Sequence, residues 1–202
     1  KIKNNKMKVI FLDNDGVICL STEWGGRHKK QQKAGRKMSQ SVNSLDVEYR
    51  FDNFNKKAIA ILNAIIEETG AEIVVSSDWK KHATLEELGD YYEAQGIIKR
   101  PIDTTAFCRD LYNDGGAAHL KDEDINWNQT WMLEQERHVE ILEWLTRHPE
   151  VTHWVAIDDL NMAKNYENIE RTWGLENFVL TPRSLEGIKQ SGIKEKVLEF
   201  LK

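Results

Sequence analysis

The chain has 202 residues, of which 40% are hydrophobic and 30% are charged, and its formal net charge is −5. This length and hydrophobic content predict one domain of ordinary size, residues 1–202, with a sizeable core. The high charged fraction and the short apolar runs argue against a membrane protein. The acidic balance argues against a protein whose whole surface binds nucleic acid, and no partner protein can be inferred.

The two cysteines, Cys19 and Cys108, are too few for a disulfide framework and lack the spacing of metal ligands. We expect both to be small core residues. No apolar signal segment follows the lysine-rich start of the chain. Together these features predict an intracellular, cytoplasmic protein.

Short apolar runs alternate with helical stretches along the chain. Lys8–Asp13 is a β-branched and aromatic run that ends at Asn14-Asp15-Gly16, which predicts a buried strand. Asn55–Thr69 has apolar residues at helical spacing and stops at Gly70, which predicts a helix. Glu72–Ser77 is apolar on both faces and predicts a second strand.

The remaining elements continue this alternation. They are a helix over Trp79–Gln95, a short third strand at Gly96–Ile98, an amphipathic helix over Gln135–Arg147, a strand over His153–Ile157, a fifth strand over Asn177–Leu180 and a closing helix over Leu185–Leu201. Apolar strands separated by helices are typical of a parallel sheet covered on both faces. The sequence therefore predicts an α/β fold.

Two long polar stretches, at about 20–52 and 101–130, interrupt the alternation, and we expect them to be inserts that overhang the site. No acidic residue occurs between Trp24 and Leu45, where Arg27, Lys29, Lys30, Lys33, Arg36 and Lys37 gather. The stretch Arg27–Lys37 has two interpretations. It is either a solvated loop or a mobile arm that attracts an anionic substrate such as a nucleic-acid end.

Acidic and hydroxyl residues follow three of the predicted strands. They are Asp13 and Asp15, then Ser76 and Ser77, then Asp158 and Asp159. Because parallel sheets bind ligands at the carboxyl ends of their strands, these groups are expected to form a site. Acidic groups gathered there would repel one another unless a cation neutralised them, and oxygen ligands without histidine or cysteine suit Mg²⁺. The six histidines show no zinc-binding spacing.

Three segments resemble motifs of the haloacid dehalogenase-like (HAD) phosphatases. Val9–Val17, VIFLDNDGV, resembles the first motif, Ile73–Lys80, IVVSSDWK, the second, and Val155–Asp159, VAIDD, the fourth. The third motif would fall on Arg137, where the family usually has lysine. The resemblance covers about residues 7–182. The stretch SSDWK and the segment Phe178–Ile188 are also similar to small HAD domains of bacterial and phage proteins, some linked with RNA repair.

The resemblance implies a Rossmann-like fold with a central parallel five-stranded sheet in the order 3-2-1-4-5 and small inserts in place of a large cap. It also implies that Asp13 is the nucleophile and that Asp15 is the general acid and base. Ser76 would donate a hydrogen bond to the phosphoryl group, and Arg137 would balance its charge.

For the metal, the resemblance implies that Mg²⁺ is held by Asp13, the Asp15 carbonyl and Asp159, with Asp158 in direct or indirect support. Gly16 would let backbone N–H groups approach the phosphate.

The accessory positions each have two interpretations. Ser77 and Asp78 either contact substrate or cap the following helix, and Lys80 is either a substrate contact or a solvated helix cation. Asn161 either positions the Asp158-Asp159 turn or belongs to an ordinary loop. Trp127 and Trp131, four residues apart, are a packing pair or a base-stacking platform.

Three functions are compatible with these features. The first is a Mg²⁺-dependent phosphomonoesterase that acts on a small phosphorylated metabolite or nucleotide. The second has the same chemistry at a 3′ or 5′ polynucleotide end, gripped by Arg27–Lys37. The third, a non-enzymatic phosphate-binding module, would be favoured by loss of Asp13 or Asp15, and both are present. Neither insert resembles a large cap domain, and the open site that this predicts would admit a bulky substrate.

Overall fold

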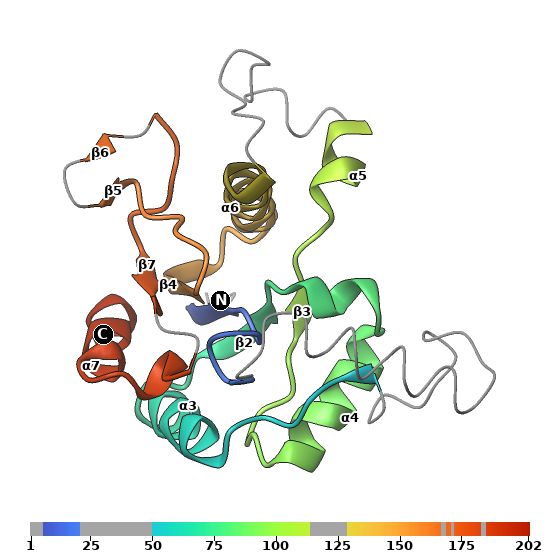
Figure 1. Cartoon of the computed structure of the whole chain (residues 1–202), viewed down its shortest axis with the longest axis vertical. Helices are drawn as coiled ribbons and strands as arrows, with labels where there is room; N and C mark the ends of the chain where they lie inside the picture. Colours follow the sequence, from blue (N-terminus) through green and yellow to red (C-terminus); the bar gives the residue numbers. More distant parts are fainter. Residues whose placement is uncertain (1–5, 21–49, 114–128, 167–168, 171, 183–184) are drawn as a thin grey trace, which may run out of the picture.

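The computed structural model describes residues 6–20, 50–113, 129–166, 169–170, 172–182 and 185–202 (Figure 1). Its centre is a five-stranded sheet in the order β3-β2-β1-β4-β7, and all its neighbouring strands are parallel. The strands are β1 (Met7–Leu12), β2 (Glu72–Val75), β3 (Asp103–Thr104), β4 (Val151–Asp158) and β7 (Phe178–Leu180). The predicted α/β, Rossmann-like fold and its strand order are confirmed.

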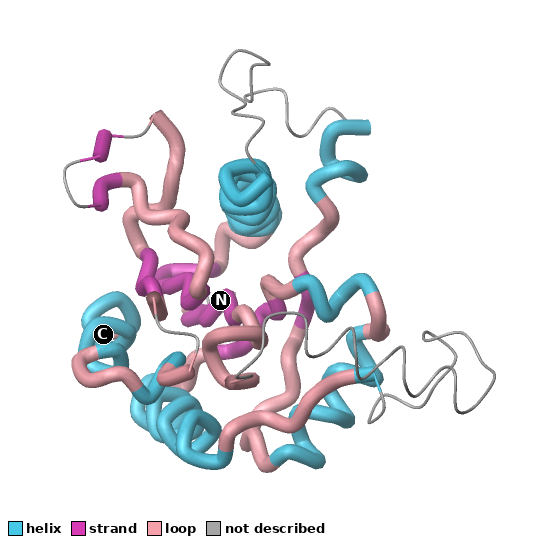
Figure 2. The backbone as a smooth tube through the Cα atoms, in the orientation of Figure 1, coloured by secondary structure: helices cyan, strands magenta, loops and turns pink. Residues whose placement is uncertain are grey.

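Helices cover both faces of this sheet, as Figure 2 shows. The longer helices are α3 (Lys56–Thr69), α4 (Leu85–Gln95), α6 (Gln129–Arg147) and α7 (Ile193–Leu201). Ile10 and Leu12 of β1 pack in the larger core cluster with α3, α4 and α7. Val9 and Phe11 point the other way and pack in a second cluster with α6. Because successive strand residues face opposite sides, a strand buried on both faces has to be apolar throughout.

The ends of α3 follow from its flanking residues. Asn55 is the N-cap, and its Oδ1 accepts the backbone N–H groups of Lys57 and Ala58. Gly70 ends the helix in the left-handed conformation with φ 72°, which glycine adopts without steric cost. The predicted helix Asn55–Thr69 is therefore confirmed.

The helix predicted over Trp79–Gln95 is two elements, a 3₁₀ turn η2 (Asp78–Lys81) and α4. The second element begins at its own capping box. The Thr84 hydroxyl accepts the Glu87 N–H, while the Glu87 carboxylate accepts the Thr84 N–H. Because this cap starts a new helix at Thr84, the segment forms two elements instead of one continuous helix.

The third strand predicted at Gly96–Ile98 is wrong. Gly96 is the left-handed C-cap of α4, with φ 96°, and Ile98 is half exposed. The third strand of the sheet is β3, whose two residues pair with Val74 and Val75. It lies inside the range 101–130 that was expected to be an insert, as does α5 (Cys108–Asn113).

Three further elements differ from the prediction. The closing helix over Leu185–Leu201 is split into η4 (Gly187–Lys189) and α7, with Gly192 at φ 84° between them. Helix α6 begins earlier than Gln135. A short antiparallel pair, β5 (Asn165–Tyr166) and β6 (Ile169–Glu170), was not predicted.

The first expected insert, at about 20–52, lies mostly outside the described residues, as do residues 114–128 of the second. The division into one domain with two inserts stays a prediction. Among the described helices, none combines the length and the apolar character that crossing a bilayer demands.

Candidate active site

The polar residues that follow the central strands lie at one edge of the sheet. β2, β1 and β4 are neighbours and run parallel, so their carboxyl ends meet. Asp13 and Asp15 follow β1, and Ser76 and Ser77 follow β2. Asp158 is the last residue of β4, and Asp159 follows it. The fold thus brings the predicted site residues to the same edge.

Three of these carboxylates form a compact cluster. Asp13, Asp158 and Asp159 each offer an oxygen, and these oxygens lie within 4.8 Å of one another. Burial, with the charge of Asp158, raises the pKa of Asp13 well above its usual range. Burial and Asp158 also raise the pKa of Asp159 to about 7. We call these three residues the carboxylate cluster.

The carboxylate cluster fits a hard divalent cation. Ionised carboxylates this close repel one another, and a bound cation removes the repulsion. Oxygen ligands suit Mg²⁺, which in proteins keeps several waters and is completed by substrate phosphate. Within the described ranges, no second group of three or more acidic, histidine or cysteine side chains has such an arrangement.

Arg137 places a positive charge beside the carboxylate cluster. The side chain comes from α6, and its Nη1 lies 2.8 Å from Asp158 Oδ2 and 3.3 Å from Asp13 Oδ1. Burial alone would lower the pKa of the guanidinium, but the two carboxylates raise it well above its ordinary value. Arg137 therefore stays charged where a transferring phosphoryl group would need a cation.

The turn after β1 requires glycine at position 16. The carbonyl of Asn14 accepts the N–H groups of Ile18 and Cys19, which closes a tight loop. Gly16 has φ 76°, and a Cβ there would lie 2.1 Å from Asp159 Oδ2. A side chain at this position would displace a member of the carboxylate cluster.

Asp15 is held by Trp79, to which the sequence analysis gave no role. The Trp79 indole Nε1 donates a hydrogen bond to Asp15 Oδ2 at 2.9 Å. Trp79 is fully buried and stacks on Phe51, with ring centroids 4.0 Å apart and planes 9° apart. Phe54 stacks on the same indole at 5.3 Å. The aromatic stack holds the Trp79 indole in place, and the indole holds the Asp15 carboxylate.

The adjacent serines after β2 have different surroundings. Ser76 is 2% exposed, and its Oγ has no hydrogen-bond partner among the described residues. Ser77 is the N-cap of η2, and its Oγ accepts the Trp79 N–H at 3.5 Å. The Ser76 hydroxyl is therefore available to a phosphoryl oxygen, whereas the surroundings of Ser77 agree with the capping interpretation.

The surroundings of Lys80 do not support the predicted substrate contact. Its Nζ donates to Thr105 Oγ1 at 2.8 Å and to the Ala106 carbonyl at 2.9 Å, and it forms an ion pair with Glu140 on α6. The side chain is only 5% exposed, so the alternative of a solvated helix cation is wrong. Burial also lowers the pKa of Lys80. Its three N–H groups are engaged in tying η2 and the segment after β3 to α6.

Asn161 and Thr181 follow β4 and β7, and each forms a side-chain hydrogen bond to the backbone. Asn161 Oδ1 accepts the Ala163 N–H at 3.1 Å, a bond within its own loop, so its predicted role at the Asp158-Asp159 turn stays a prediction. Thr181 follows β7, is fully buried and donates from Oγ1 to the Gly16 carbonyl at 3.2 Å. Thr181 was not among the predicted site residues, although a hydroxyl directly after a strand is the signal that led to Ser76.

Both cysteines are buried, and neither forms a disulfide. Burial, with the nearby Glu136 and Glu140, raises the pKa of the Cys108 thiol to about 12. A thiol that stays protonated at neutral pH is a poor nucleophile. This agrees with the expected packing role.

Two predicted nucleic-acid features lie outside the described residues. The basic stretch Arg27–Lys37 belongs to the range 21–49, and Trp127 belongs to the range 114–128. Trp131 is part of α6, but its side chain is not among those described. Their roles in binding or stacking stay predictions.

Comparison with known families gives a match over residues 9–190. The matched family is described as the HAD domain in Swiss Army Knife RNA repair proteins. Neither the curated proteins nor the solved structures contain a significant match to the chain.

Proposed function

The chain belongs to the family of HAD domains found in Swiss Army Knife RNA repair proteins, and we propose that it is a Mg²⁺-dependent phosphatase that acts on a phosphorylated RNA end. The observation that carries this proposal is the buried contact of Arg137 with Asp13 and Asp158. A carboxylate nucleophile, a fixed cation and a metal-compatible cluster meet there at the edge of the sheet.

In the proposed reaction, an Asp13 oxygen attacks phosphorus in line. The bond from phosphorus to the leaving oxygen breaks, and an aspartyl-phosphate forms. Asp15 gives its proton to the leaving oxygen and later accepts a proton from the water that hydrolyses the intermediate. Arg137 and the Ser76 hydroxyl stabilise the charge on the transferring phosphoryl oxygens.

The carboxylate cluster, with the carbonyl of Asp15, would hold the metal ion. When bound, Mg²⁺ supplies the positive charge that offsets the carboxylates and the phosphate. Burial raises the pKa of Asp13, and a bound cation would favour the ionised carboxylate, which is the nucleophilic form.

An RNA end is the favoured substrate because the matched family occurs in RNA repair proteins. A small nucleotide or phosphorylated metabolite is the second candidate. It is favoured by a cavity of about 420 Å³ beside Arg137, which lies in the size range of small-molecule sites.

The first test is phosphate release with Mg²⁺, and with EDTA as control. The substrates are 3′- and 5′-phosphorylated oligoribonucleotides, mononucleotides and p-nitrophenyl phosphate, each at two salt concentrations. We expect metal-dependent release that favours oligonucleotides and falls steeply with salt, because phosphate contacts release counterions. Release that favours small esters and ignores salt would select the second candidate. No release from any ester would contradict the phosphatase.

A matched pair of substitutions tests the nucleophile. Asp13→Asn removes the attacking oxygen with little change in volume, and turnover should fall by roughly 10³-fold or more. Asp90→Asn, on the exposed surface of α4, makes the same chemical change where the carboxylate only pairs with the exposed Arg100. We expect Asp90→Asn to keep wild-type turnover, and near-native turnover in Asp13→Asn would refute the assignment.

A further inference from the structure

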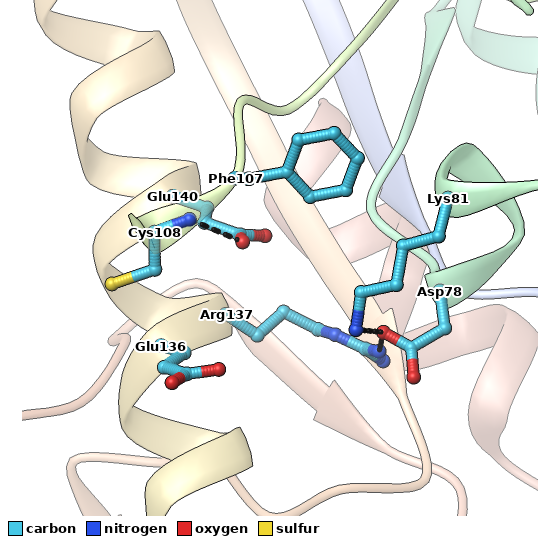
Figure 3. Close-up of a pocket in the computed structure, with 7 residues that line it drawn as sticks. All are labelled: Asp78, Lys81, Phe107, Cys108, Glu136, Arg137 and Glu140. Atoms are coloured by element: carbon cyan, nitrogen blue, oxygen red, sulfur yellow. Dashed lines mark hydrogen bonds and ion pairs between the residues drawn. The ribbon is translucent and has the colours of Figure 1, made fainter. Parts of the chain in front are cut away.

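The cavity beside Arg137 lies between α6, η2 and the segment that leads into α5 (Figure 3). Its volume is about 420 Å³, and it is lined by Asp78, Lys81, Phe107, Cys108, Glu136, Arg137 and Glu140. The Arg137 guanidinium that borders this cavity also contacts Asp13 and Asp158. Arg137 therefore borders both the cavity and the carboxylate cluster.

Phe107 gives the cavity a flat apolar wall. Its half-buried ring points into the cavity in Figure 3. The Lys80 ammonium lies 5.1 Å from the ring centroid, a cation–π distance. Because Lys80 is itself fixed by Glu140, the ring is held in a defined position.

Among the described residues that line this cavity, Glu136 is the charged group without an ion pair. Asp78 pairs with Lys81 at 2.9 Å and with Arg137 at 3.4 Å, and Glu140 pairs with Lys80. Glu136 has neither a hydrogen bond nor an ion pair with any residue that the structure describes. A half-buried carboxylate in this state gains most from a ligand that donates an N–H group.

We propose that this cavity receives the nucleoside that carries the scissile phosphate, with its base against Phe107 and a base-edge N–H donated to Glu136. This inference rests on the proposed function. A nucleobase combines a flat π face, which matches the Phe107 ring, with N–H donors at its edge, which match the Glu136 carboxylate. A ribose phosphate would satisfy Glu136 but leave the Phe107 ring uncovered.

Equilibrium binding tests the proposal without turnover. In the Asp13→Asn background with Mg²⁺, dissociation constants are measured for adenosine 3′- and 5′-monophosphate and for the matching ribose phosphates. We expect the preferred nucleotide to bind roughly tenfold more tightly than its ribose phosphate, because stacking on an aromatic ring contributes that much per base. Phe107→Leu and Glu136→Leu should each bring this ratio towards one.

Phe200→Leu, at another half-buried phenylalanine, on α7, is the matched control and should keep the ratio. Equal binding of nucleotides and ribose phosphates, or a ratio that neither cavity substitution lowers, would overturn the proposal. Thermal unfolding checks that the variants fold, and Glu136→Leu decides alone if Phe107→Leu does not. A wild-type chain that releases no phosphate contradicts the phosphatase, while the binding ratio still reports on the cavity.

Discussion

Ser76 and Ser77 are adjacent after β2, but among the described residues only the Ser77 hydroxyl has a hydrogen-bond partner. Ser76 Oγ is buried without a partner among the described residues, and Ser77 Oγ caps η2. We expect Ser76→Ala to lower kcat/KM by roughly 10- to 100-fold, as loss of a phosphoryl hydrogen bond should, with little change in melting temperature.

The matched change, Ser77→Ala, should instead lower the free energy of unfolding by about 1 kcal/mol, because it removes a cap. Its loss of kcat/KM should be the smaller of the two. Steady-state kinetics and thermal unfolding of both variants provide the comparison. The reverse pattern would show that the roles are exchanged.

Trp79 positions the proposed general acid, and Trp79→Phe tests this. Phenylalanine keeps the stack on Phe51 but removes the N–H that binds Asp15. For nucleotide esters, whose alkoxide leaving group needs a proton, kcat/KM should fall by roughly 10- to 100-fold. For p-nitrophenyl phosphate, whose leaving group departs without a proton, the fall should be clearly smaller. Equal losses on both esters would mean that Trp79 serves only the core.

The residues at the strand ends could be predicted from the sequence, but the role of Trp79 beside them could not. Asp13, Ser76 and Asp158 directly follow or end apolar runs, so the alternation of apolar runs with helical stretches is enough to place them. The role of Trp79 depends on Phe51 and Phe54, which lie in or near a stretch expected to be an insert. The direction of the Trp79 side chain is set by η2, a 3₁₀ turn that hydrophobic periodicity does not reveal.

At the scale of elements, the buried ion pair between Lys80 and Glu140 connects η2 to α6. Lys80→Met would leave the Glu140 carboxylate buried and unpaired, which costs about 3–5 kcal/mol of unfolding free energy. The double change Lys80→Met with Glu140→Gln should recover part of this loss, because it removes the unpaired charge. Chemical denaturation measures both.

The exposed pair of Arg147 with Glu143, at 2.8 Å on the same helix, is the control. Arg147→Met should cost less than about 1 kcal/mol, since solvent screens an exposed pair. Similar costs for Lys80→Met and Arg147→Met would contradict the structural role of Lys80.

Element boundaries could be predicted where the chain carries its own signals. Asn55 and Gly70 supply both ends of α3. The two-residue strand β3 is too short for any periodicity, and tertiary pairing with β2 selects it. Thr84 and Gly192 divide two predicted helices, because a local cap and a positive φ override continued helical spacing.

At the scale of the whole molecule, the carboxylate cluster sets a pH dependence of stability. Burial raises the pKa of Asp13 and of Asp158, and that of Asp159 to about 7. Without metal, the folded state therefore binds more protons than the unfolded state from about pH 4, the ordinary aspartate pKa, upwards. Its stability should fall as pH rises through this window to about 7.

Added Mg²⁺ should reverse this loss. It binds the ionised cluster, so its stabilisation should be larger at pH 8 than at pH 5, and roughly 2.7 kcal/mol at 100 times its Kd. Thermal unfolding with MgCl₂, against NaCl of equal ionic strength, measures the difference. An equal or larger effect at pH 5 would contradict metal binding at this cluster.

The strand order illustrates how much of the whole molecule could be predicted. Apolar runs alone indicate a parallel sheet, and the motifs at Asp13, Ser76 and Asp158 add the order through a family resemblance. They do not reveal the cavity beside Arg137, because its walls come from three segments whose packing no local pattern encodes. The substrate is a property of such walls rather than of the fold.

The most direct test of the central claim is to trap the phosphoryl group on Asp13. Borohydride reduces an acyl phosphate to an alcohol, so the chain is incubated with Mg²⁺ and substrate, quenched with borohydride and analysed by peptide mass spectrometry. We expect substrate-dependent conversion of the Asp13 carboxyl to an alcohol, with no such change at Asp15 or Asp159. Rapid phosphate release with an unmodified Asp13, or with the label on another residue, would contradict Asp13 as the nucleophile.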